Sequence, residues 1–507
     1  MSNETYGALV QRLHQINDVN GALALLGWDQ QTKMPPAGAA ARAERVATLA
    51  GIAHEMATSE ELGALIDALG DYEASLSLDS DEACLIRIAR RQYDKARVIP
   101  TSLATEISRA EALGYAAWTE AKASGDFKAF LPALTNIVDL TRQYIALHKT
   151  AKQDVADDYD ILLDDYEPLL TAAEVDVVFD KLKEATIPLV GLVTERSDLV
   201  HDNLIHQTFP IPTQRAFIDT LATTLGVDPA SWRIDDTVHP FANPIALEDI
   251  RITNHYYEET IGPVLFGTMH EFGHGLYERQ VSPSIARTPL QRGASMAWHE
   301  SQSRTWENLI GRGRPFWDWA TPQLASAFPD QLSDATPDAL FRAVNRLGPS
   351  LIRIEADELT YNLHIILRYE LERDIFAGRV ALADLPEAWN AKISQYFGIP
   401  VPNDSVGVLQ DVHWGSGLFG YFPTYALGNV VAVQVWQRIA RELPDLDTQV
   451  ASGEFAPLRE WLRKNIHQHG SKFTPKELLQ RVVGTDTFDP EPLITYLRGK
   501  VNALYGA

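Results

Sequence analysis

Cysteine is almost absent from this chain of 507 residues, since Cys84 is the only one. A single cysteine excludes an intrachain disulfide framework and any metal site built from clustered thiolates. It is also typical of a protein kept in a reducing compartment. Any metal ion must therefore be bound by histidine, aspartate and glutamate, and Cys84 itself is expected to be a small buried hydrophobe.

Long hydrophobic runs are also missing from the sequence. The longest apolar stretches, such as Ala22–Trp28 and Val430–Trp436, are far shorter than the about 20 residues that cross a bilayer. The first residues, Met1–Tyr6, lack the basic start and the apolar stretch of a signal peptide. These observations predict a cytoplasmic protein with no membrane partner.

Positive charge is scarce, with 44 Lys and Arg residues against 68 Asp and Glu residues and a net charge of −24. Nucleic acids and anionic membranes attract clustered cationic side chains, so this balance argues against both as main partners. Charged residues make up 22% of the chain and hydrophobic residues 45%, which is ordinary for a globular protein and excludes a disordered one. On length alone the chain can form one to about three domains.

Helical periodicity dominates the hydrophobic pattern. Near the start, Leu9, Leu13 and Ile16 recur at the spacing of one buried helix face. Similar patterns cover residues 80–120, 172–200, 213–226, 336–378, 427–443 and 455–467. Thr474–Glu477 reads as a capping box with proline in the first turn, and Gly484 ends that helix. The sequence therefore predicts a mainly α protein.

One segment departs from this pattern and predicts a small β element. In Asp249–Tyr257, Ile250 and Ile252 alternate with polar residues. Such a strand could pair with an extended peptide, and a purely structural hairpin is the alternative. Because no linker of low complexity and no repeat is visible, we expect residues 1–507 to form a single domain with two helical lobes, and two separate domains are the alternative.

The most informative segment is His270–His274, which reads His-Glu-Phe-Gly-His and fits the HExxH pattern. Residues four apart on a helix share one face, so both imidazoles can reach one ion. Glu271 lies beside them, where it can take a proton from a water on that ion; two packed histidines without a metal are the alternative. Gly273 and Gly275 each cost a helix about 1 kcal/mol, so we expect another part of the chain to approach this backbone closely.

A catalytic zinc ion needs three protein ligands and one open position. Glu278 lies one turn beyond His274, but from there it reaches poorly toward an ion that His270 also binds. Glu300 begins a new amphipathic segment after a turn at Arg292-Gly293, so a second helix can deliver its carboxylate. We therefore predict His270, His274 and Glu300 as the ligands of one divalent metal, with a solvated Glu300 as the alternative. Zn suits this set best, and Co or Mn would accept the same ligands.

Further motifs accompany HExxH along the chain. They are Asp249-Ile250-Arg251-Ile252-Thr253, His299-Glu300-Ser301-Gln302, Arg353-Ile354-Glu355-Ala356-Asp357-Glu358 and Gly407-Val408-Leu409-Gln410-Asp411-Val412-His413-Trp414. Together they resemble the thermostable-carboxypeptidase family of metallopeptidases, the Taq carboxypeptidase group, over essentially the whole chain. The resemblance implies a large helical metallopeptidase fold with a deep active-site groove and a divalent metal at its floor. It also implies a homodimer that releases single amino acids from peptide C-termini with broad specificity.

If the protein hydrolyses peptides as the resemblance implies, individual residues can be given roles in the reaction. Glu271 is the general base, and the oxyanion of the tetrahedral intermediate requires hydrogen-bond donors besides the metal. The segment 413–425 is rich in glycine and aromatic residues and suits a loop close to substrate. We predict His413 and Tyr421 as these catalytic donors, with Tyr425 in reserve; aromatic packing in a turn is the alternative for each.

Recognition of a free C-terminus requires a group that binds a carboxylate, and a forked guanidinium does so with two parallel hydrogen bonds. Arg353 is the first candidate because it lies in a motif of the resemblance, and Arg251 and Arg368 could close the end of the groove. For any single arginine, a salt bridge to a neighbour such as Asp357 or Glu358 is the alternative. The three arginines should form a local positive site within a negative protein.

Two other functions fit parts of this pattern. One is an oligopeptidase of the same HExxH-plus-Glu type that cuts inside short peptides, and the other is a non-catalytic binding protein stabilised by a metal. The acidic stretch 154–167 does not follow the spacing of an EF-hand loop, so we interpret it as a solvated helix start. His467 and His469 suit a helix C-terminus better than a metal site.

Overall fold

The computed structural model describes residues 2–152 and 155–506, which form two compact units. Unit 1 comprises the residues up to 97 together with 202–344 and 435–487. Unit 2 comprises 98–201, 345–434 and the residues from 488 onward. Helices dominate both units, as the hydrophobic pattern predicts.

Unit 1 contains the N-terminal helices, the sheet and the HExxH segment. Its α-helices include α1 (Ser2–Thr32), α2 (Ala39–Ala57), α3 (Glu60–Asp67), α4 (Gly70–Ser75), α5 (Asp81–Arg97), α10 (Ile211–Leu225), α11 (Gly262–Arg279), α12 (Met296–Arg304), α13 (Arg314–Ala327), α14 (Pro329–Leu332), α15 (Pro337–Val344), α19 (Leu446–Ala451), α20 (Ala456–Asn465) and α21 (Pro475–Val483). The predicted capping box of Thr474 and Glu477 starts α21, and Gly484 ends it in a left-handed conformation.

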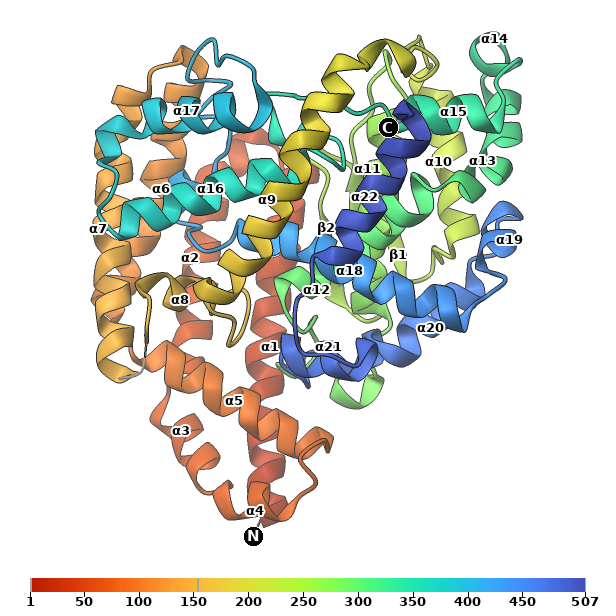
Figure 1. The fold of residues 1–507 in the computed structure, drawn as a ribbon. Coiled ribbons are helices and arrows are strands. Elements are labelled where there is room, and N and C mark those ends of the chain that lie inside the picture. The colour runs from red at the N-terminus through yellow and green to blue at the C-terminus, as the bar shows by residue number, and fades with distance from the viewer. Residues whose placement is uncertain (1, 153–154, 507) are drawn as a thin grey trace. The chain divides into compact units, whose positions relative to one another are not determined.

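The first helices of unit 1 share a hydrophobic core with Leu247, Val281, Ile285 and Leu290 of the same unit. Figure 1 shows α3, α4 and α5 beside the first part of α1. Leu9 and Leu13 are buried there against residues of α3 and α5, which confirms the predicted helix face. Cys84 lies in the same core as a free, fully buried thiol, also as predicted.

The small β element of unit 1 is a three-stranded sheet in the order β1-β3-β2. Its strands are β1 (Trp232–Asp236), β2 (Ala242–Ala246) and β3 (Asp249–Asn254). The predicted strand is therefore real, but it ends at Asn254 and lies in the centre of the sheet. It pairs with β1 in parallel and with β2 in antiparallel orientation. Since both of its edges are occupied, the interpretation that this strand pairs with an extended substrate is wrong.

Unit 2 is built from long helices that include α6 and α7, which lie side by side after a turn at Gly125 (Figure 1). Its α-helices include α6 (Thr101–Ser124), α7 (Phe127–Ala151), α8 (Asp158–Leu163), α9 (Ala172–Glu195), α16 (Tyr361–Phe376), α17 (Leu385–Phe397) and α22 (Glu491–Tyr505), together with the first part of α18 (Pro423–Glu442). Asp157 caps α8, so the acidic stretch does form a helix start, but Asp164 and Glu167 are buried and not solvated as predicted. Asp154 lies outside the described residues.

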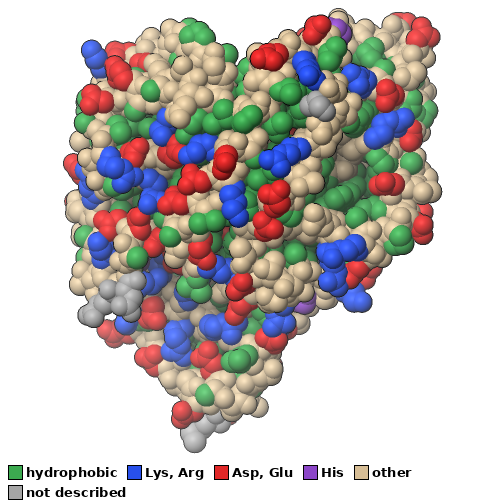
Figure 2. All heavy atoms as spheres, in the orientation of Figure 1, with side chains coloured by type: hydrophobic (Ala, Val, Ile, Leu, Met, Phe, Trp, Pro, Cys, Tyr) green, Lys and Arg blue, Asp and Glu red, His purple; other side chains and the backbone are tan. Residues whose placement is uncertain are grey.

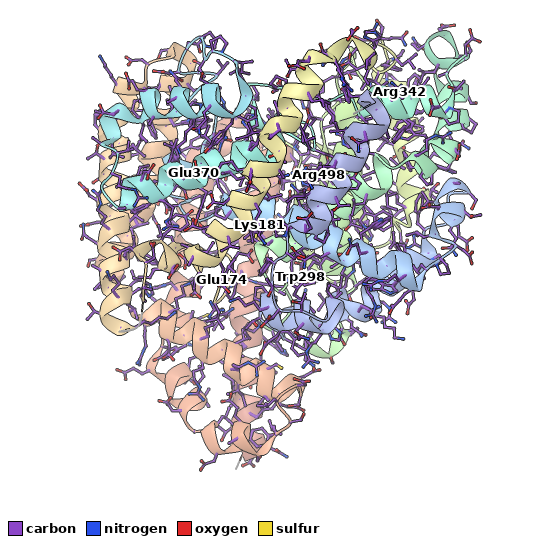
Figure 3. The ribbon with its side chains drawn as sticks, viewed as in Figure 1. Glu174, Lys181, Trp298, Arg342, Glu370 and Arg498 are labelled. Atoms are coloured by element: carbon purple, nitrogen blue, oxygen red, sulfur yellow. The ribbon has the colours of Figure 1, made fainter. Side chains whose placement is uncertain are left out.

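Charged side chains of both signs lie on the protein surface. On the face drawn in Figure 2, Lys and Arg side chains are interspersed with Asp and Glu. On α16, for example, Glu370 (labelled in Figure 3) accepts hydrogen bonds from Lys183 and Lys392, both at 2.6 Å. Among the residues that the structure describes, none of the helices combines the length and the apolar character that crossing a bilayer requires.

Candidate metal centre

Two glycines on α11 allow its neighbours to approach the HExxH segment. A Cβ on Gly275 would lie 2.6 Å from the ring of Trp232 in the sheet, and a Cβ on Gly273 would lie 2.5 Å from the backbone oxygen of Gln302 on α12. The predicted close approach is therefore confirmed at both positions. Trp298 (Figure 3) also anchors α12, because it is buried and donates its indole N–H to Pro475 O at 3.0 Å.

The three predicted metal ligands converge on one point of unit 1. The Nε2 atoms of His270 and His274 lie 3.2 Å apart. The Oε2 atom of Glu300 lies 3.7 Å from Nε2 of His270 and 3.4 Å from Nε2 of His274. Zinc bonds of about 2.0–2.1 Å in a tetrahedron place ligand atoms roughly 3.3 Å apart. The observed separations bracket this value, so the donor set fits a small divalent cation.

Carboxylate and guanidinium groups hold these ligands from behind. His270 Nδ1 lies 2.9 Å from Glu307, a residue of the π-helical turn η4 (Thr305–Gly311) that continues α12. Arg304 donates to Glu300 at 2.6 Å and to Glu307 at 3.1 Å. The sequence pattern did not single out Glu307 or Arg304. Their spacing from Glu300 could have identified them, since residues four and seven positions apart share a helix face.

Electrostatics in this pocket favours positive charge. Burial opposes the charged form of His270, yet Glu300 and Glu307 raise its pKa to about 9. Burial also opposes ionisation of Glu300, but Arg304 and His270 hold its pKa far below the usual range. Burial raises the pKa of Glu271 to about 7. The pocket thus presents an ionised carboxylate to a cation beside a carboxyl group that can exchange a proton near neutral pH.

Two residues that the sequence analysis considered as metal ligands and set aside have other partners. Glu278 contacts His299 at 2.8 Å. His467 is buried between Gln280, at 2.7 Å, and Gln302, at 2.8 Å. Within the described residues, the group able to hold a metal consists of His270, His274 and Glu300.

Unit 2 gathers a second cluster of buried charge around Asp411. Arg353, in the turn η5 (Arg353–Glu355), donates to Asp411 Oδ1 at 2.9 Å, and Arg368 of α16 donates to Oδ2 at 2.6 Å. Arg353 also donates to the Tyr361 hydroxyl at 3.2 Å. Both arginines are buried, and their guanidinium groups hold the pKa of Asp411 far below its usual range against the effect of burial.

The alternative partners expected for Arg353 prove wrong. The Asp357 carboxylate accepts hydrogen bonds from backbone N–H groups, among them that of Gly348 at 2.7 Å. Glu358 pairs with Lys500. The true partner, Asp411, belongs to a motif noted in the sequence but lies 58 residues away in the chain. Spacing along the chain does not reveal such a pairing.

The predicted oxyanion donors lie in the same cluster of unit 2. His413 begins the turn η7 (His413–Ser416), and its Nε2 lies 3.3 Å from the Tyr425 hydroxyl. The rings of Tyr421 and Tyr425 pack edge to face at 5.2 Å. The Arg353 guanidinium lies 5.1 Å from the centre of the Tyr425 ring. Burial lowers the pKa of His413 to about 3 despite the nearby acid, so its imidazole is neutral.

Arg251 does not join this cluster, because it belongs to the sheet of unit 1. Its guanidinium donates two hydrogen bonds of 2.8 Å to Asp249 and lies 4.5 Å from a ring centre of Trp28. The structure therefore brings together two of the three predicted arginines, Arg353 and Arg368.

A buried carboxylate beneath the 413–422 loop was missed by the sequence pattern. Glu372 of α16 is fully buried. It accepts hydrogen bonds from the Tyr159 hydroxyl at 2.6 Å, the Trp414 indole at 2.8 Å and the Gly420 backbone at 2.9 Å. Burial raises its pKa to about 7, although these donors oppose the shift. Glu372 thus ties both ends of the loop to α16.

Comparison with known proteins agrees with these features. The family model described as carboxypeptidase Taq (M32) metallopeptidase matches residues 8–501. The chain is 40% identical to thermostable carboxypeptidase 1 of Thermus thermophilus over 95% of each chain, and 38% identical to carboxypeptidase 1 of Bacillus subtilis over 97% of each. The crystal structure of an M32 carboxypeptidase from Deinococcus radiodurans has a TM-score of 0.95 at 37% identity, covering 99% of this chain and 100% of that one.

Proposed function

Because this chain belongs to the carboxypeptidase Taq (M32) metallopeptidase family and is a metal-dependent carboxypeptidase, we propose that His270, His274 and Glu300 hold its metal. The observation that carries this proposal is the convergence of two imidazole nitrogens and one carboxylate oxygen at the separations of a tetrahedral site. The same separations favour Zn over ions that require longer bonds.

Glu271 is the general base in this proposal. A zinc ion held by these three ligands would lower the pKa of its water to about 7 and would itself polarise the peptide carbonyl. Glu271 follows His270 directly on α11 and is buried. Since burial raises its pKa to about 7, this carboxylate can accept a proton from the water and return it to the leaving amine.

The cluster around Asp411 provides groups for the substrate. Two guanidinium groups share one carboxylate there, so the cluster keeps an excess of positive charge that suits a free C-terminus. Arg353 is the group that we assign to that carboxylate, with Arg368 behind it. His413 and Tyr421 are the donors assigned to the oxyanion, and Tyr425 orients His413 through its hydroxyl.

Metal removal tests the proposed ligands. The protein is stripped with a chelator, reloaded with Zn, Co or Mn in turn, and assayed for metal content and for amino-acid release from a peptide ladder. We expect one ion per chain, activity only after reloading, and loss of both binding and activity in His270→Ala. A His270→Ala variant that still binds one ion per chain would overturn the ligand set.

A pair of peptides tests whether the enzyme recognises the free C-terminal carboxylate of its substrate. We expect stepwise release of single residues, with broad specificity, from a short peptide with a free C-terminus and almost none from its amidated twin. Equal cleavage of both would favour the oligopeptidase interpretation over the assignment of the arginines.

We further propose that the enzyme is a homodimer and works on peptides in the cytoplasm. The family resemblance supports the dimer, and the single, buried Cys84 suits a reducing compartment. Light scattering on the purified protein tests the dimer, since the chain mass is 56.4 kDa. A scattering mass equal to this value would contradict it.

A further inference from the structure

A series of contacts leads from His274 away from the metal pocket to Glu278. His274 Nδ1 lies 2.6 Å from Nδ1 of His299, and Nε2 of His299 lies 2.8 Å from Glu278 Oε1. The backbone N–H of Gly293 donates to the same oxygen at 3.3 Å. Glu278 is buried, and all four residues belong to unit 1. One metal ligand thus has two side chains in series behind it.

The carboxylate at the end of this series fixes the direction of each hydrogen bond. An ionised carboxylate only accepts, so His299 must carry its hydrogen on Nε2, and a neutral imidazole then offers only an acceptor at Nδ1. His274 must therefore donate from Nδ1, which leaves its Nε2 without a hydrogen. That nitrogen is the one that faces Nε2 of His270 at 3.2 Å and Glu300 at 3.4 Å.

We propose that Glu278 and His299 are positioning residues that hold His274 in the tautomer required for metal binding. The inference rests on the proposed metal site and adds to it two residues that do not contact the ion. A carboxylate behind a ligating imidazole commonly sets its tautomer and orientation. Here the carboxylate acts through a second imidazole instead of directly.

Comparison with His270, the other histidine ligand, shows the effect of placing the His299 ring between His274 and a carboxylate. His270 contacts the Glu307 carboxylate directly at 2.9 Å, and Arg304 pairs with that carboxylate at 3.1 Å. On the His274 side, the ring of His299 transmits the direction of the hydrogen bond and keeps the Glu278 carboxylate one side chain away. The pocket therefore gains a fixed tautomer without another carboxylate beside Glu300.

Close packing keeps the His299 ring in place. The His299 ring centre lies 4.7 Å from that of His274 and 5.5 Å from that of Tyr277. A Cβ on Gly293 would lie 3.0 Å from His299 Cδ2 and 3.0 Å from Tyr277 Cε1. Glycine at this position therefore lets the backbone N–H reach Glu278 beside both rings.

Zinc affinity and histidine tautomers test the proposal in parallel. Zn²⁺ binding is measured by chelator competition, and the tautomers are read from nitrogen chemical shifts of metal-free protein with ¹⁵N-labelled histidine. We expect Glu278→Leu to weaken Zn²⁺ binding by about 10- to 100-fold and to change the His274 tautomer signals. Glu278→Gln keeps an acceptor oxygen and should lose much less. Glu259→Leu, which removes an exposed carboxylate of the same unit, should match the wild type.

The outcomes separate this inference from the proposed metal site. Wild-type Zn²⁺ affinity and unchanged tautomers in Glu278→Leu would overturn the positioning role. If His270→Ala loses Zn²⁺ binding in the same experiment, the proposed ligand set still stands. Equal losses in Glu278→Leu and Glu278→Gln would also overturn it, because the acceptor oxygen would then be irrelevant. If Glu278→Leu does not fold, His299→Phe removes the acceptor for His274 and must weaken Zn²⁺ binding by a similar factor. Unchanged affinity in that variant would contradict the proposal.

Discussion

The two units bury charge in opposite ways. In unit 1, the carboxylates of Glu271, Glu300 and Glu307 lie in a pocket where Arg304 and Arg312 supply the compensating guanidinium groups. Metal binding requires neutral histidines and an ionised Glu271, and in that state three carboxylates against two guanidinium groups leave an excess of one negative charge. Without the ion, the proton on His270, whose pKa is about 9, compensates this excess. Such an excess is costly in a buried place unless a cation completes it.

In unit 2 the imbalance has the opposite sign. Arg353 and Arg368 face the single carboxylate of Asp411, which leaves an excess of one positive charge. In each cluster the excess charge is opposite in sign to the group that the cluster is proposed to bind. The excess is negative for the divalent cation in unit 1 and positive for the terminal carboxylate in unit 2. Each prediction below tests one side of this comparison.

The largest effect is expected at the general base in unit 1. Glu271→Gln should lower the rate of amino-acid release by about 10²- to 10⁴-fold, because it removes the group that moves the proton. Metal content should stay at the wild-type level, since Glu271 is not among the ligands. Glu258→Gln, on an exposed loop residue of the same unit, is the control and should keep full activity. Undiminished turnover in Glu271→Gln would exclude the assigned role.

The next largest effect is expected on stability in unit 2. Asp411→Asn leaves two buried guanidinium groups without their carboxylate, which should lower the free energy of unfolding by about 3–5 kcal/mol. Asp249→Asn is the matched control, because Asp249 also pairs with an arginine but is partly exposed, and it should cost at most about 1 kcal/mol. Denaturant unfolding measures both. Similar losses in the two variants would contradict the difference in burial.

A third effect concerns the pH dependence of stability in unit 2. The pKa of Glu372 rises from its usual value of 4.5 to about 7 in the folded protein. The folded state therefore binds the proton more tightly, and this group's contribution to stability is full below pH 4.5 and declines as the pH rises to 7. The total decline amounts to about 3 kcal/mol.

Glu372→Gln should remove this decline, because the amide does not titrate. Melting temperatures of the wild type and the variant at pH 5 and pH 8 measure the difference. The gap between them should shift in favour of the variant at pH 8. A gap that does not change with pH would mean that Glu372 does not titrate in this range.

The smallest effect separates the arginines of the two units. Arg353→Ala should lower kcat/KM for a peptide with a free C-terminus by roughly 30- to 150-fold, which corresponds to about 2–3 kcal/mol of lost carboxylate binding. Arg251→Ala should cost far less, because its guanidinium is already bound to Asp249 in the sheet of unit 1. A larger loss in Arg251→Ala would assign the terminal carboxylate to the other arginine.

Local spacing was enough to predict the cluster of side chains that we propose as the metal site. His270 and His274 are one turn apart, and Gly273 between them predicted a close approach of another segment, which proves to be α12 with Glu300. Helical periodicity likewise predicted helices such as α1, α9 and α16, since burial of one face leaves a trace every three or four residues, but it missed others such as α2, α7 and α22.

Other features depend on contacts between distant parts of the chain. The alternation around Ile250 and Ile252 predicted a strand, but a buried strand has the same alternation whether its edges are free or paired. The pairing of Asp411 with Arg353 and Arg368 joins residues 58 and 43 positions apart. Which carboxylate these arginines share depends on the three-dimensional structure and not on spacing along the chain.

The contact at Gly273 has a consequence for the proposed metal site. A methyl group there would lie 2.5 Å from Gln302 O, about 0.9 Å short of the 3.4 Å at which ordinary contact begins. Metal sites hold their ligand distances within about 0.2 Å. An added methyl group would therefore displace Glu300 from the histidines by far more than that tolerance allows. The single hydrogen atom that is the side chain of Gly273 thus sets how closely α11 and α12 approach at the proposed metal site.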